Sequence, residues 1–72
     1  MRFLVEVERE NDGRWIAGVR DLPGVHVYGG TEAEALTKVQ ALALSVLADE
    51  IEHGERDGST LLTVTFESAR AA

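Results

Sequence analysis

Carboxylates are the most abundant groups in this chain that could do chemistry. The 72 residues include 13 Asp and Glu, and converging carboxylates can hold divalent ions on a phosphate, as in a metal-dependent nuclease. Glu6 and Glu8 share one face of a predicted strand. The remaining candidates lie in a turn, on a helix expected to cover the opposite face, or at the far end of a neighbouring strand: Asp12, Asp49, Glu50, Glu52 and Glu67. We therefore expect no metal site and interpret Glu6 and Glu8 as solvated strand positions.

Other catalytic patterns are also missing from the sequence. His26 and His53 are its two histidines, and neither belongs to a recognisable arrangement with a serine nucleophile. The glycine-rich phosphate motifs GxxxxGK[ST] and GxGxxG do not occur. The segment Gly29–Thr31 could offer helix N–H groups to an anion, but Thr31 is expected to occupy that position itself as a helix cap. The sequence thus predicts no catalytic residue, no cofactor and no enzymatic activity.

The composition indicates the expected cellular compartment and the kinds of partner that the chain could bind. No cysteine is present and the longest apolar run is Ala41–Leu44, so we expect a cytoplasmic protein without disulfides, membrane segment or signal peptide. The seven basic residues are scattered along the chain, which argues against direct nucleic-acid binding. The net charge of −6 could steer a basic protein partner or could simply maintain solubility.

Hydrophobic periodicity predicts three strands in the first half of the chain. Residues 3–8 alternate, with Phe3, Val5 and Val7 on one face. Residues 10–13 form a hairpin turn, followed by strands at 14–19 and 25–28. The phase of the second strand is ambiguous because its apolar residues point to both faces. Trp15 and Tyr28 therefore fit either the core or a recognition surface.

Turn and cap residues connect the third strand to a helix. Leu22, Pro23 and Gly24 indicate a tight turn, since proline fixes φ and glycine can take a positive φ. Gly29 and Gly30 end the strand. Thr31 and Glu34 then form a capping box for a helix from residue 32 to about residue 53.

The second half of the chain combines this helix with a final strand. An apolar stripe at helical spacing is formed by Leu36, Val39, Ala43, Val46 and Leu47. Residues 61–67 alternate as a fourth strand, and residues 68–72 are expected to be a disordered tail. The order β-β-β-α-β with a right-handed crossover predicts an α+β fold with strand order 3-2-1-4 and the helix on one face.

The order and spacing of these elements resemble the HicB family of toxin–antitoxin antitoxins. The resemblance covers residues 3 to about 52 and includes Phe3–Val7 and Asp12–Ala17. Its motif residues are Trp15, Leu22, Pro23, Gly24, Gly29, Thr31, Glu34 and Ala35. It implies a truncated ribonuclease H fold without the nuclease carboxylates, in a single HicB-like domain at residues 1–67.

The resemblance also implies a function. Such a module neutralises a small, basic, messenger-RNA-cleaving HicA toxin by covering its active surface. We expect the contact surface to be the outward sheet face or the N-terminal region of the helix, and it includes Glu6, Glu8, His26 and Tyr28. Fuller HicB antitoxins often carry a C-terminal DNA-binding segment, and the residues after Phe66 are too few for one. A solitary homo-oligomeric scaffold or regulator with an unknown partner is therefore the alternative.

Element lengths suggest self-association. A helix of 22 residues spans roughly 33 Å, whereas a strand of seven residues spans about 23 Å. The helix is expected to overhang its sheet and to offer Leu44, Leu47 and Ile51 to a second copy. If the helix instead crosses the sheet obliquely, one chain could bury all of these residues.

Overall fold

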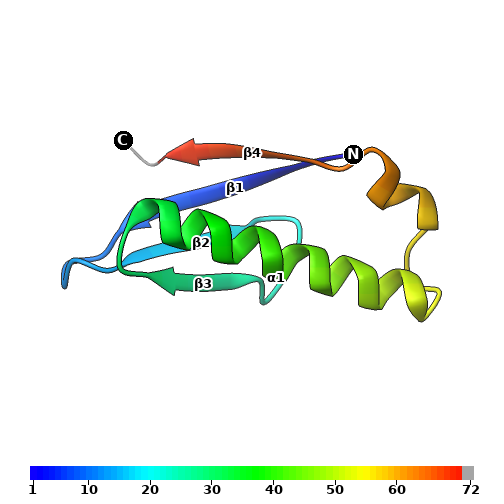
Figure 1. The fold of residues 1–72 in the computed structure, drawn as a ribbon, viewed down its shortest axis with the longest axis horizontal. Helices are drawn as coiled ribbons and strands as arrows, with labels where there is room; N and C mark the ends of the chain where they lie inside the picture. Colours follow the sequence, from blue (N-terminus) through cyan, green and yellow to red (C-terminus); the bar gives the residue numbers. More distant parts are fainter. Residues whose placement is uncertain (71–72) are drawn as a thin grey trace.

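The computed structural model describes residues 1–70. Within them the chain forms β1 (Arg2–Arg9), β2 (Trp15–Val19), β3 (His26–Gly29), α1 (Glu32–Glu52), the 3-10 helix η1 (Gly58–Leu62) and β4 (Thr65–Arg70). The strands make one mixed sheet in the order β3-β2-β1-β4. Helix α1 lies across one face of this sheet (Figure 1). The predicted α+β fold and its strand order are confirmed.

Strand pairing settles which residues face the helix. β1 is antiparallel to β2 and parallel to β4, and β2 is antiparallel to β3. Phe3, Val5 and Val7 are buried beneath α1, as the alternation predicted. In β2, Ala17 and Val19 are buried, so the intervening Gly18 belongs to the opposite face. The ambiguous phase of the second strand is thereby resolved.

The predicted turn before β3 is confirmed in detail. The Val25 N–H donates to the Leu22 carbonyl at 3.1 Å, which closes a four-residue turn around Pro23 and Gly24. Gly24 has φ +83°, the value that a type II turn requires at its third residue. Leu22 is only 2 % exposed and anchors this turn in the core.

Helix α1 begins with the predicted cap. The Thr31 hydroxyl accepts a hydrogen bond from the Glu34 N–H at 3.1 Å. The Glu34 carboxylate forms an ion pair with Lys38 at 3.0 Å, and the hydrogen bond from Lys38 is the main reason that the pKa of Glu34 lies below its ordinary value. The threonine half of the predicted capping box is thus present in the structure.

One residue per turn of α1 enters the core. These residues are Ala35, Val39, Ala43 and Leu47, each 0 % exposed. The helix crosses the sheet obliquely, and its C-terminal half continues beyond β3 (Figure 1). Because Leu47 is completely buried within one chain, the prediction that it contacts a second copy is wrong. Leu44 is 41 % exposed and Ile51 is half-buried, so an interface role for these two residues stays a prediction.

The last strand begins later and extends further than expected. Residues 58–62 form η1 because the Asp57 carboxylate accepts the Ser59 N–H at 2.9 Å and caps this turn. Leu62, which lies within the predicted strand 61–67, is instead in η1 and is 83 % exposed. Residues 68–70, predicted as part of a disordered tail, instead continue β4, where Ser68 lies opposite Val5 on β1. Residues 71–72 of that predicted tail lie outside the described part of the chain.

Candidate partner-binding face

The sheet face opposite α1 brings the four predicted contact residues together. The register aligns Glu6, Gly18 and His26 in one row across β1, β2 and β3, and Glu8, Ile16 and Tyr28 in the next. The side chains of Glu6, Glu8, His26 and Tyr28 are all exposed. We call this surface the open sheet face, and it comprises Glu6, Glu8, Arg14, Ile16, Gly18, Arg20, His26 and Tyr28.

Glu6 is held by an arginine that the sequence analysis did not identify. Arg20 donates from Nη2 to Glu6 Oε2 at 2.9 Å and from Nε to Oε1 at 3.3 Å. The hydrogen bond from Arg20 is the main reason that the pKa of Glu6 lies below its ordinary value. Both side chains are more than half exposed, and such surface pairs add little stability. Arg20 therefore already supplies a counter-charge to Glu6 within the chain.

Tyr28 and Glu8 form the second row of this face. The Arg14 guanidinium lies 4.3 Å from the centroid of the Tyr28 ring in a cation–π contact, and Tyr28 as a residue is 45 % exposed. Arg14 also donates from Nε to Asp12 Oδ2 at 2.7 Å. Within the described part of the chain, Glu8 makes no ion pair, so it is the uncompensated carboxylate of this face.

Trp15 and Tyr28, whose sequence context fitted either the core or a recognition surface, lie on opposite faces of the sheet. Trp15 is half-buried and packs against the core, in register with Gly29 of β3. Tyr28 projects from the open sheet face. Of the two, Tyr28 is therefore the one available to a partner.

A shallow hollow of about 190 Å³ opens beside the first row. Gly18 lies in this hollow and keeps it open because it has no side chain. A Cβ at this position would lie 3.3 Å from the Val25 carbonyl oxygen and 3.6 Å from the His26 side chain. The turn that the sequence predicted supplies one wall. The lining residues are Glu6, Gly18, Val19, Arg20, Leu22, Pro23, Gly24 and His26.

The charge of the open sheet face differs from the simple acidic surface that we expected. Within this face Glu6 is paired with Arg20, and Arg14 of the face is paired with Asp12 in the hairpin turn. Beside the face, on β1 and β4, Arg2 is paired with Glu67. Glu67 lies in register with Leu4, so it is nearer to Glu6 along the sheet than expected. Residues 32–57 instead contain seven acidic and two basic residues. Most of the net negative charge therefore lies on α1 and the following loop.

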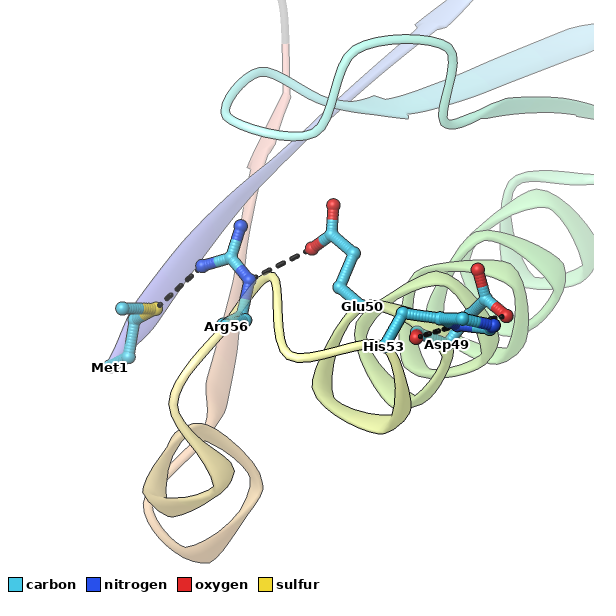
Figure 2. Close-up of polar contacts among 5 residues, drawn as sticks. All are labelled: Met1, Asp49, Glu50, His53 and Arg56. Atoms are coloured by element: carbon cyan, nitrogen blue, oxygen red, sulfur yellow. Dashed lines mark hydrogen bonds and ion pairs between the residues drawn. The ribbon is translucent and has the colours of Figure 1, made fainter.

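The C-terminal end of α1 is fixed by polar contacts (Figure 2). Arg56 donates from Nε to Glu50 Oε1 at 2.9 Å and from Nη1 to Met1 Sδ at 3.7 Å. His53 forms the C-cap, with Nδ1 2.8 Å from the Asp49 carbonyl oxygen. Arg56 thus connects the C-terminal end of α1 to Met1, the residue that precedes β1. Glu50 therefore has a structural role, because it holds Arg56 in this position.

Residues 1–70 contain neither a metal site nor a membrane-spanning helix. No group of three or more His, Asp or Glu side chains there is arranged to hold a metal ion. Nor does any helix in that range combine the length and apolarity needed to cross a bilayer. Comparisons of the chain with protein-family models, with curated proteins and with solved structures found no match.

Proposed function

We propose that this chain is a non-catalytic protein-binding module of the cytoplasm that resembles a HicB antitoxin. In this proposal it binds a basic HicA-like toxin through the open sheet face and blocks the toxin's access to messenger RNA. The inhibition is stoichiometric occlusion, so it requires no cofactor, no metal and no chemistry by this chain.

One observation carries the proposal: the sheet is covered by α1 on one side and presents a mixed polar and aromatic surface on the other. Tyr28 supplies exposed aromatic area of the kind that is enriched in interfaces. Glu8 supplies a carboxylate that a partner's cation can pair with directly. The hollow beside His26 offers a recess of about 190 Å³ for one protruding side chain.

A solitary homo-oligomeric scaffold or regulator is the second candidate. It requires self-association, and two surfaces could supply the contact: Leu44, which is 41 % exposed on a helix that extends past β3 (Figure 1), and the edge of β4. The chain is also small, and chains of roughly 60 residues bury only about 60 % of their unfolded surface. Covering more apolar surface by self-association would stabilise such a chain.

Isolation of the protein from its native cells separates these candidates. Native mass spectrometry of the affinity-purified chain should reveal a small basic companion in a fixed ratio. Adding the chain to that companion should stop RNA cleavage at the same ratio. Recovery of the chain without a companion favours the scaffold, and RNA cleavage by the chain itself overturns the non-catalytic assignment.

A further inference from the structure

The edge of β4 is the longest unpaired strand edge among the described residues. β4 has six residues and bonds to β1 on one side, whereas β3 at the other edge has four. A free edge presents a row of backbone donors and acceptors that another strand can pair with. Natural edges are often protected by proline, by charged side chains (especially lysine) or by a cover. Residues 65–70 contain no proline or lysine, and of their two charged residues, Glu67 and Arg70, Glu67 is paired with Arg2. Helix α1 packs mainly on β1, β2 and β3.

The hydrogen-bond pattern shows which backbone groups face outward. The Thr65 N–H donates to the Met1 carbonyl at 2.8 Å, so Thr65 directs its backbone groups toward β1. Because the direction alternates along a parallel strand, Phe66 and Ser68 direct their N–H and C=O groups to the free edge. Ser68 is exposed and Phe66 is half-buried against the core. The free edge is therefore open to solvent at Ser68.

We propose that a second copy of this chain pairs with the β4 edge across a two-fold axis, so that an antiparallel β4–β4 junction joins two sheets into one mixed eight-stranded sheet. A strand is self-complementary when it pairs antiparallel with its own copy, which is the symmetry of a closed dimer. Both copies of α1 then lie on the same side of the joined sheet. The half-buried Phe66 of each chain lies next to the junction.

The charge distribution favours dimerisation through the β4 edge over dimerisation through helix α1. Residues 59–70 contain one acidic residue, Glu67, and it is already paired with Arg2. A helix-to-helix dimer would instead bring together two copies of the segment that holds seven acidic and two basic residues. Like charges directly opposite on paired strands are destabilising. The two-fold axis therefore passes at Ser68 or Phe66, since an axis at Glu67 would set two carboxylates opposite each other.

Ser68→Pro tests this dimer without removing a bond between β1 and β4. The lost N–H points to the free edge, and proline is tolerated on edge strands. Sedimentation velocity over a concentration series should give twice the 7.8 kDa chain mass for the wild type and for the matched control Ser68→Ala. Ser68→Pro should halve this mass with an unchanged circular dichroism spectrum. Leu44→Lys, which alters the exposed helix face, should leave the dimer intact.

Amide exchange gives a readout that does not depend on the proline variant folding. The Phe66 and Ser68 amides of the wild type should become protected as the protein concentration rises. A monomeric wild type at all concentrations would overturn the proposal. So would a dimer that survives Ser68→Pro or is abolished by Leu44→Lys, and so would exchange at these two amides that does not change with concentration.

Discussion

Gly29→Ala should cause one of the largest losses of stability available to a single methyl group in this chain. Gly29 is buried where β3 meets the first turn of α1, and an added Cβ would lie 2.6 Å from the Ala35 nitrogen and 3.1 Å from the Thr31 carbonyl oxygen. Both neighbours are backbone atoms, so β3 and α1 must separate to admit the methyl group. Overpacking of this kind costs typically about 1–3 kcal/mol, and occasionally more.

Chemical denaturation of Gly29→Ala and Gly30→Ala measures this effect with a matched control. Gly30 is exposed, and a Cβ there would meet only the end of the Glu34 side chain, at 3.9 Å. The free energy of unfolding of Gly30→Ala should stay within about 0.5 kcal/mol of the wild type. Equal changes in the free energy of unfolding for the two variants would contradict the close packing of β3 against α1.

Leu47→Ala should destabilise the chain by about 2–5 kcal/mol, the usual cost of truncating a buried leucine. Leu47 is among the largest fully buried side chains of the described residues, and neighbours on a regular helix and sheet cannot collapse fully into the space it leaves. Thermal or urea unfolding of the variant gives the loss directly.

The comparison with Leu44→Ala distinguishes core from interface. Leu44 is three residues away on the same helix and is 41 % exposed. Its truncation should change the free energy of unfolding by at most about 0.5 kcal/mol. The loss in Leu47→Ala should also be independent of protein concentration, because the side chain is buried within one chain. A loss that vanishes on dilution would instead place Leu47 between copies.

The sequence was most informative where a local signal agreed with the hydrophobic period. β1 alternates cleanly, the stripe of α1 repeats every three or four residues, and Pro23, Gly24 and Thr31 mark a turn and a cap that the structure contains. The prediction that the last strand begins at residue 61 was wrong. The apolar alternation there is real, but it is preceded by Asp57 and Gly58. There the carboxylate cap on Ser59 favoured a 3-10 turn over a strand.

The candidate site was only partly predictable for a different reason. The exposure of Glu6, Glu8, His26 and Tyr28 follows from alternation within each strand. Their neighbours depend on register between strands, which the ambiguous phase of β2 left open. Arg20 reaches Glu6 across 14 residues of sequence, and Gly18 forms the hollow only because it lies beside His26. No local pattern encodes either pairing.

Association kinetics with the basic companion tests most directly whether the open sheet face is the binding surface. Glu8→Lys reverses the uncompensated carboxylate of that face, and Glu52→Lys makes the same charge change on an exposed position of α1. At low salt, Glu8→Lys should slow association by up to about 10-fold, and added salt should reduce the difference. Glu52→Lys should have a much smaller effect. Equal rates for the two variants, or a larger effect of Glu52→Lys, would contradict binding through this face.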